Sequence, residues 1–214
     1  MLKQFENQFF SYVKSVMNHD QAHNINHILR VVKTAKALCH DENGKLEVVL
    51  PAAYLHDCFS FPKNHPSRSQ SSSIAAEKAT QFLHSISYPN EYFIEINHAI
   101  VAHSFSANIP PTTLEAQIVQ DADRLDALGA IGIARCLQVG TNLGIELYNS
   151  EDPFCHARTP DDSCYSIDHF YTKLFKLVET MNTDSAKIEA KKRVTFMKEY
   201  LRQLETEISI ATSV

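Results

Sequence analysis

The chain has 214 residues, a formal net charge of −5, five cysteines and no tryptophan. Its lysines and arginines are dispersed, which argues against a nucleic-acid partner, and no apolar run of about 18 residues suggests a membrane-spanning helix. Residues 1–20 lack the features of a signal peptide and no C-x-x-C pair occurs, so we expect a cytoplasmic protein with reduced thiols.

Apolar residues recur at helical spacing at the start of the chain. They predict a first helix over residues 4–17 and a second over about 21–40. In the second helix, His23 and His27 are four residues apart and therefore share a face, outside the main apolar stripe. Two histidines in this relation can bind one metal ion. The alternative is a pair of half-exposed surface imidazoles.

A short apolar helix, predicted from Leu46 to Cys58, ends in two titratable residues, His56 and Asp57. Adjacent helical residues diverge by about 100°, so these two do not share a face, but both can reach one ion beside the helix end. Pro51 is expected in the first helical turn, where its missing N–H needs no partner. The alternative is a helix end that carries polar residues without a ligand.

The segment after this helix is basic and has no apolar period, so residues 59–71 are expected to form a loop. Lys63, His65 and Arg68 are crowded within it. Arginine presents a planar fork and lysine a point charge to a phosphate group. The loop is therefore a candidate phosphate site, and the alternative is a set of solvated charges.

Two helices are predicted next, one from the serine run 71–73 to about residue 86 and one over about 90–103. In the second, His98 and His103 are five residues apart and do not lie on one stripe. Each is a candidate for the functional site or for a hydrogen-bonded position in the core. Residues 104–112 contain two prolines and are not expected to be helical.

The next predicted helix covers residues 114–139, with Thr113 as its N-cap. It contains three acids within six residues, Asp121, Asp123 and Asp126, among apolar residues, where they are costly unless they are paired or bound to metal. Asp123 and Asp126 share a face, whereas Asp121 points elsewhere.

The last third of the chain begins with an irregular stretch, residues 140–166, of the kind that often covers a functional site. Two amphipathic helices follow, with apolar stripes from Phe170 to Met181 and from Ile188 to Ile208. No segment alternates like a strand and no linker divides the chain. The sequence therefore predicts an all-α protein, a compact single-domain helical bundle over residues 1–214.

The order His27, His56-Asp57, Asp123, with each motif on a separate predicted helix, resembles the HD-domain metal-dependent phosphohydrolase superfamily. The similarity extends to a bacterial subgroup of stand-alone HD proteins and covers about residues 5–207. In that subgroup, counterparts exist for residues 62–66, 98–105, 121–124 and 169–174.

The resemblance implies an HD-domain fold with a metal-site core of about residues 20–140, on which the C-terminal helices of residues 166–208 pack. It also implies one divalent ion held by His27, His56, Asp57 and Asp123. Two imidazoles and two carboxylates suit a metal of intermediate hardness. We expect Mn²⁺, with Mg²⁺, Co²⁺, Ni²⁺, Fe²⁺ or Zn²⁺ as alternatives.

The reaction that the resemblance implies is cleavage of a phosphate ester or phosphoanhydride of a small nucleotide by metal-activated water, with Asp57 nearby. The candidates for phosphate binding are Lys63, Arg68 and His103. The candidates for supporting the metal ligands or contacting the substrate are His23, His65, His98 and Asp126. Some relatives carry a glutamate shortly after His-Asp that moves protons, but residues 58–61 contain no acid.

Two other functions remain open. One is a nucleotide-sensing module that uses the same metal and loop without turnover. The other is a di-iron oxygenase, because some HD proteins hold two irons. That site needs more than four ligands, and His98 and His103 are the residues that could add them. The oligomeric state is not indicated by the sequence.

Overall fold

The structure is a computed structural model that describes residues 2–16, 25–62 and 65–211, with side chains described as far as residue 208. In these ranges the chain forms helices and loops, and its β-structure is limited to one isolated bridge between Glu146 and Tyr165. The prediction of an all-α fold is confirmed. The chain divides into two compact units, Met1–Asp123 with Asn182–Ala186, and Arg124–Met181 with Lys187–Val214. That the whole chain is a single domain stays a prediction.

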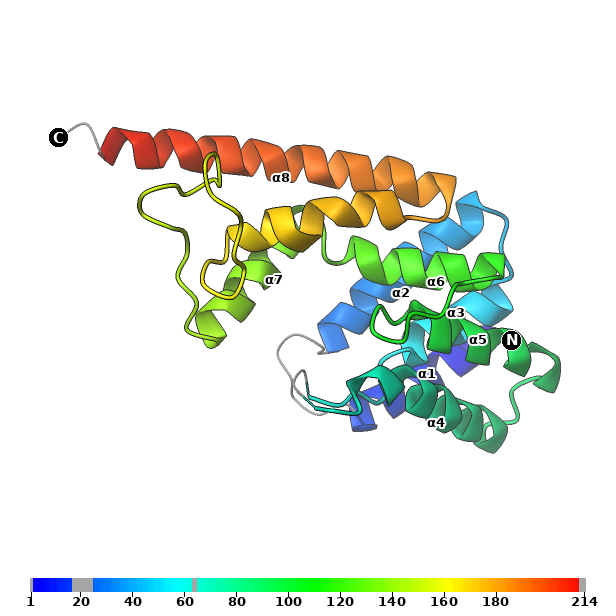
Figure 1. Ribbon diagram of the computed structural model, residues 1–214. Helices are drawn as coiled ribbons and strands as arrows, with labels where there is room; N and C mark the ends of the chain where they lie inside the picture. The colour runs from blue at the N-terminus through cyan, green and yellow to red at the C-terminus, as the bar shows by residue number, and fades with distance from the viewer. Residues whose placement is uncertain (1, 17–24, 63–64, 212–214) are drawn as a thin grey trace. The chain divides into compact units, whose positions relative to one another are not determined.

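Helix α3 (Leu46–Leu55) is the central element of the first unit (Figure 1). It packs against four other helices, and every side chain from Val48 to Leu55 is buried. A helix that is apolar all round belongs in a core, so α3 forms the wall from which His56 and Asp57 emerge. The other α-helices of this unit are α1 (Leu2–Val16), α2 (Ile25–Asp41), α4 (Ser71–Ser85), α5 (Phe93–His103) and α6 (Leu114–Leu125).

Pro51 lies inside α3, so the prediction that it occupies the first turn is wrong. A proline at this position cannot donate to the carbonyl of Glu47, four residues earlier. The Tyr88 hydroxyl donates to that carbonyl instead, at 2.6 Å. At the start of the helix, the Glu115 carboxylate accepts the Lys45 backbone N–H at 3.0 Å. Side chains from distant segments therefore satisfy the backbone groups that α3 cannot pair by itself.

The helix predicted over residues 114–139 is two helices, α6 and α7 (Gly129–Asn142), so that prediction is wrong. The break is built around Gly129, whose φ of +72° lies in the left-handed region that favours glycine. At Gly132, a Cβ atom would lie 2.2 Å from the Ala127 carbonyl oxygen, so only glycine allows this close approach. The N-cap prediction is confirmed, because the Thr113 hydroxyl accepts the Ala116 N–H at 3.2 Å.

The segment from Phe170 to Met181, in the second unit, is a five-residue π-helix (Phe170–Leu174) followed by a 3-10 helix (Phe175–Thr180). The prediction of an amphipathic α-helix here is wrong in helix type. Phe170, Leu174 and Leu177 are all buried. Their spacings of four and three residues also occur on one face of an α-helix, so the sequence pattern could not distinguish the three helix types. The last helix of the chain is α8 (Asp184–Ala211).

Hydrogen bonds among residues 152–168 order part of the irregular stretch that follows α7. The Asp152 carboxylate accepts the backbone N–H groups of His156, Ala157 and Arg158. The Arg158 guanidinium donates two hydrogen bonds to Asp168, whose side chain is fully buried. This part of the chain is therefore a loop whose conformation is held by hydrogen bonds.

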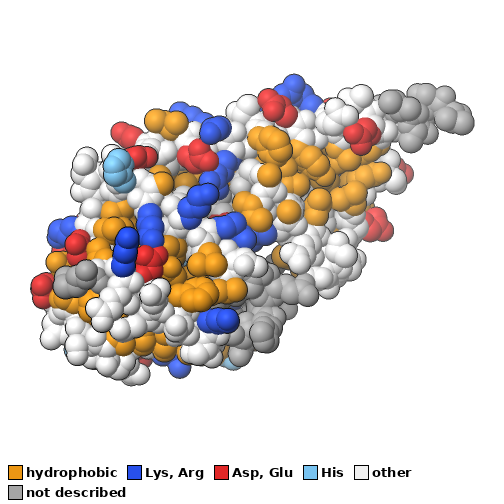
Figure 2. Space-filling view, turned by 180° about the vertical axis from the view of Figure 1, so that it is seen from behind, with side chains coloured by type: hydrophobic (Ala, Val, Ile, Leu, Met, Phe, Trp, Pro, Cys, Tyr) orange, Lys and Arg blue, Asp and Glu red, His pale blue; other side chains and the backbone are white. Residues whose placement is uncertain are grey.

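The surface carries scattered apolar side chains in both units. Ile94 in α5 is 84% exposed and Ile188 in α8 is 71% exposed. On the face drawn in Figure 2, apolar side chains lie both in groups and between charged ones. Of the helices described, none has the length and apolar character that crossing a membrane requires.

Candidate metal centre

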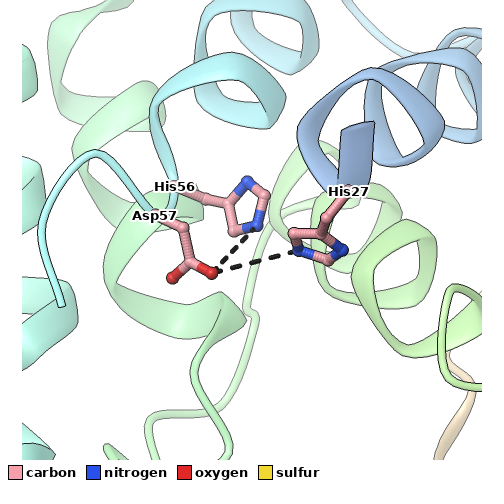
Figure 3. A group of neighbouring side chains, drawn as sticks. All are labelled: His27, His56 and Asp57. Carbon is pink, nitrogen blue, oxygen red and sulfur yellow. Dashed lines mark ion pairs between the residues drawn. The ribbon is translucent and has the colours of Figure 1, made fainter. Parts of the chain in front are cut away.

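His27, His56 and Asp57 point toward one another in the first unit (Figure 3). His27 lies in the first turn of α2, His56 is the C-cap of α3, and Asp57 follows it. One oxygen of Asp57, Oδ2, is 3.9 Å from His27 Nε2 and 3.8 Å from His56 Nε2. The atoms of these three residues that could bind a metal all lie within 4.8 Å of one another. His27, His56 and Asp57 could therefore hold a divalent ion.

Asp123 of α6 reaches the same place. Its Oδ1 atom is 3.4 Å from His27 Nε2 and 3.9 Å from His56 Nε2. These separations exceed a hydrogen-bond length of about 3.2 Å. Two atoms that each lie about 2.0–2.2 Å from one ion can be up to about 4.4 Å apart. The spacing is thus too long for direct hydrogen bonds and suitable for ligands around a shared ion.

The imidazole of His56 is oriented by its own helix. Its Nδ1 atom donates to the Ala53 carbonyl at 2.9 Å, which leaves Nε2 unprotonated on the side of the cluster. This Nε2 atom is buried and has no hydrogen-bond partner among the residues described. Metal-binding histidines typically donate their other ring N–H to a carbonyl in this way. Burial lowers the pKa of His56 to about 4, against the effect of Asp57, so the ring stays neutral, as metal binding requires.

The cluster is closed on the inside by its imidazoles and open on the side of its carboxylates. The side chains of His27 and His56 are 2% and 0% exposed, whereas those of Asp57 and Asp123 are 15% and 28% exposed. As far as the described residues show, the carboxylate side is therefore the open approach to an ion here.

His103, at the end of α5, adjoins the cluster and is buried. Its Nδ1 atom donates to the Ile100 carbonyl at 2.6 Å, and its Nε2 atom lies 3.6 Å from Asp57 Oδ1. Burial lowers the pKa of His103, but the contact with the Asp57 carboxylate and the charge of Asp123 raise it more, so the pKa stands above its usual value of 6.5. The raised pKa favours the cationic form of His103, and phosphate binding by this residue stays a prediction.

The other candidates of the basic loop are placed differently. Arg68 donates to the Ser60 hydroxyl at 2.6 Å and to the Phe61 carbonyl, so part of its guanidinium holds the loop itself. The His65 ring stacks on the Phe61 ring. Phosphate binding by Arg68 and a substrate contact by His65 stay predictions. Lys63 and His23 lie outside the described residues.

His98 and Asp126 have partners of their own. The Nε2 atom of His98 accepts the Thr112 backbone N–H at 3.0 Å, which attaches the loop 104–112 to α5. Asp126, in the second unit, is buried and receives the Arg135 guanidinium at 2.6 Å. It lies beyond the end of α6 rather than one turn along from Asp123 in the same helix. The predicted roles of both residues in supporting the site remain untested.

The sequence did not reveal the two carbonyls that orient the histidines, those of Ala53 and Ile100. Each lies three residues before its histidine, in the last turn of a helix, where carbonyls have no partner within the helix. A histidine at the C-terminal end of a predicted helix was the available signal.

Similar proteins are known over nearly the full length of the chain. A family model for the HD domain matches residues 24–128. The Bacillus subtilis (strain 168) protein YpgQ is 32% identical over 212 residues, or 97% of this chain and 95% of YpgQ. A crystal structure of YpgQ in complex with ADP has a TM-score of 0.74 and 34% identity, with 96% of this chain and 95% of that chain covered. An HD-superfamily hydrolase from Bacillus thuringiensis has a TM-score of 0.76 and 31% identity, with 97% and 98% covered.

Proposed function

Because this chain belongs to the HD-domain family, we propose that it is a metal-dependent phosphohydrolase that cleaves a phosphate ester or phosphoanhydride of a small nucleotide. The observation that carries the proposal is the convergence of two buried imidazoles and two carboxylates around the unpartnered Nε2 atom of His56. The hydrolase from Bacillus thuringiensis supports the reaction class, and the complex of YpgQ with ADP supports a nucleotide as the substrate.

The residues that would hold the ion are His27, His56, Asp57 and Asp123. Their nitrogen and oxygen atoms suit Mn²⁺, which we expect, or another divalent ion of similar hardness. When bound, such an ion lowers the pKa of a water ligand and polarises a phosphoryl oxygen. The chain's own contribution is to hold neutral imidazoles in place through the last turn of α3 and to admit the substrate from the carboxylate side.

Asp57 connects the ligand cluster to the residue that we assign to the phosphate. Its Oδ2 atom faces the imidazoles of His27 and His56, and its Oδ1 atom faces His103. The raised pKa of His103 favours its cationic form. A phosphate oxygen that approaches from the carboxylate side would meet this charge, which offsets the repulsion from the two carboxylates.

A di-iron oxygenase is less well supported than a site with one ion. A second ion needs ligands beyond the four named above. His103 adjoins the cluster, but the Nε2 atom of His98 already accepts the backbone N–H of Thr112. A sensing module without turnover remains the alternative that the same geometry supports.

The proposal is tested by incubating the purified chain with Mn²⁺ and a panel of nucleoside mono-, di- and triphosphates, and by measuring phosphate and pyrophosphate separately. We expect release with Mn²⁺, none with EDTA, and none from His56→Ala, whose helical circular dichroism should be retained. Tight nucleotide binding without release would favour the sensing module. Two ions per chain by elemental analysis would favour the oxygenase.

A further inference from the structure

An aromatic pair lies in the loop directly after the His56-Asp57 dipeptide. The rings of Phe61 and His65 are nearly parallel, with centroids 4.2 Å apart and an interplanar angle of 4°. The ring of Phe59 meets Phe61 edge-on, at 5.0 Å and 85°. Three aromatic rings within seven residues therefore form one small platform.

The platform is held by hydrogen bonds at its base. The Arg68 guanidinium donates to the Ser60 hydroxyl and to the Phe61 carbonyl. The Ser71 hydroxyl, at the start of α4, accepts the Phe61 backbone N–H at 3.1 Å. Arg68 and Ser71, which follow the loop, therefore hold Ser60 and the Phe61 backbone in place. The backbone that carries the Phe61 ring is therefore held by the chain itself.

The outer member of the pair, His65, is exposed. One face of its imidazole covers Phe61, which leaves the opposite face as the one on which a ligand ring could stack. Its Nδ1 atom accepts the Ser67 backbone N–H at 3.1 Å, so the neutral ring carries its proton on Nε2. The ring thus presents a flat face with a fixed orientation and one donor at its edge.

The distance between this platform and the metal cluster is bounded by the chain. Phe61 follows Asp57 by four residues, so their Cα atoms are at most about 14 Å apart. A nucleotide whose phosphates lie at the carboxylates of Asp57 and Asp123 extends its base away from them. The platform is one aromatic surface of the described residues that the chain keeps within that reach.

We propose that the exposed face of His65, backed by Phe61, stacks against the nucleobase of the substrate. This inference rests on the proposed function. Nucleobases stack on histidine and phenylalanine rings, and such stacking tolerates any base because every base has a π-face. We therefore expect the platform to distinguish nucleotides from inorganic phosphates while distinguishing weakly between bases.

A competing surface is Phe105, which is 71% exposed and follows His103 by two residues. It also lies near the cluster along the chain. The Phe61–His65 pair is favoured because its outer ring is already supported by a parallel ring and by the Ser67 N–H. A test must therefore compare both positions.

The central variant is His65→Asn, which removes the ring but keeps an oxygen that can accept the Ser67 N–H. With Mn²⁺ present, calorimetry should show ADP binding weakened by about tenfold, or about 1.4 kcal/mol, and pyrophosphate binding unchanged. The matched control is His84→Asn, which removes another exposed imidazole that packs on a phenylalanine, Phe93, at 4.5 Å. It should bind both ligands like the parent chain.

Four results separate the possibilities. Equal weakening of ADP and pyrophosphate by His65→Asn would assign His65 to phosphate or to loop structure and overturn the stacking. Unchanged ADP binding by His65→Asn would also overturn it. If only Phe105→Ala weakened ADP binding and left pyrophosphate binding unchanged, the stacking surface would be Phe105 instead. If the parent chain binds neither ligand, the proposed function fails and the stacking fails with it.

An optical measurement gives an independent result, because the chain contains no tryptophan. His65→Trp introduces a single indole on the Phe61 ring. We expect ADP to quench its fluorescence over the concentration range in which the parent chain binds ADP, and pyrophosphate to leave it unchanged. Saturating ADP without quenching would contradict the stacking.

Discussion

Two polar clusters, one in each unit, differ in how their side chains contact one another. In the second unit, Asp168 is fully buried and accepts two hydrogen bonds from Arg158 and one from the Asp161 N–H. In the first unit, the carboxylates of Asp57 and Asp123 face imidazoles at 3.4–3.9 Å, beyond hydrogen-bond length.

This difference in hydrogen bonding indicates that the two clusters have different roles. A buried polar group without a hydrogen bond costs about 1–3 kcal/mol. In the Asp168 cluster, side chains and a backbone N–H of the chain supply the hydrogen bonds, so we call this cluster complete. The cluster around His56 Nε2 is incomplete, because this buried atom has no hydrogen-bond partner among the residues described. Its free-energy cost would be offset if a ligand supplied the missing partner.

The largest expected effect breaks the incomplete cluster. Asp123→Asn should lose the metal ion and all turnover, because a lost metal ligand weakens metal binding by more than the about 10–100-fold typical of residues that only orient ligands. Its helical content and unfolding free energy without metal should match the parent, since a core of this size should not depend on the ion. Elemental analysis of the purified variant measures this, and full metal occupancy would contradict the assignment of Asp123.

The next effect breaks the complete cluster. Arg158→Leu leaves the buried Asp168 without its counter-charge, so the free energy of unfolding should fall by about 3–5 kcal/mol. Metal content should stay at the parent's value. Urea unfolding measures the loss, and Arg202→Leu, at an exposed position of α8, is the control with little expected change. A loss below about 1 kcal/mol would show that the pair is not needed.

A smaller effect compares two acids two residues apart in α6. Asp121 is fully buried and accepts the backbone N–H groups of Asn182 and Thr183 together with the Thr183 hydroxyl. Asp121→Asn should therefore lower the free energy of unfolding by about 1–3 kcal/mol while the ion is retained, the reverse of Asp123→Asn. Loss of the ion from Asp121→Asn would make Asp121 part of the metal site.

The smallest effect is a pH dependence in the complete cluster. Burial raises the pKa of Asp168, but the Arg158 guanidinium and the Asp161 N–H lower it more, so it lies below its usual value of 3.8. A depressed carboxyl pKa stabilises the fold above the unfolded value and ceases to do so as the pH falls through the folded value. The stability difference between the parent and Arg158→Leu should therefore be full at pH 7 and shrink below about pH 4. A constant difference in urea unfolding from pH 7 to 3 would contradict this origin.

Part of the site could be predicted, because histidine and aspartate are typical metal ligands and their order along the chain was visible in the sequence. His27, His56 and Asp57 come together as expected, since His27 lies in α2 and the His56-Asp57 dipeptide directly follows the buried helix α3. The choice between His98 and His103 could not be made, because both lie in one predicted helix and only the packing decides which is buried beside Asp57.

The fold was predictable in class but not at its irregular points. Apolar residues continue through Leu125 and Leu128, so the periodicity concealed the turn between α6 and α7. The same turn brings Arg135 to Asp126. In a continuous helix, these two residues would lie nine positions, or about 13.5 Å, apart along the axis. Long-range compensation was equally invisible, because nothing near Pro51 in the sequence indicates Tyr88.

The bond between Tyr88 and the Glu47 carbonyl makes two distant positions interdependent in evolution. The hydroxyl is needed because Pro51 removes a backbone donor, and it becomes redundant where position 51 carries a residue with an N–H. Drift from tyrosine to phenylalanine at position 88 should therefore be tolerated chiefly in descendants that have already lost the proline. The two sites should covary although neither contacts the metal cluster, and the order of the two changes should matter.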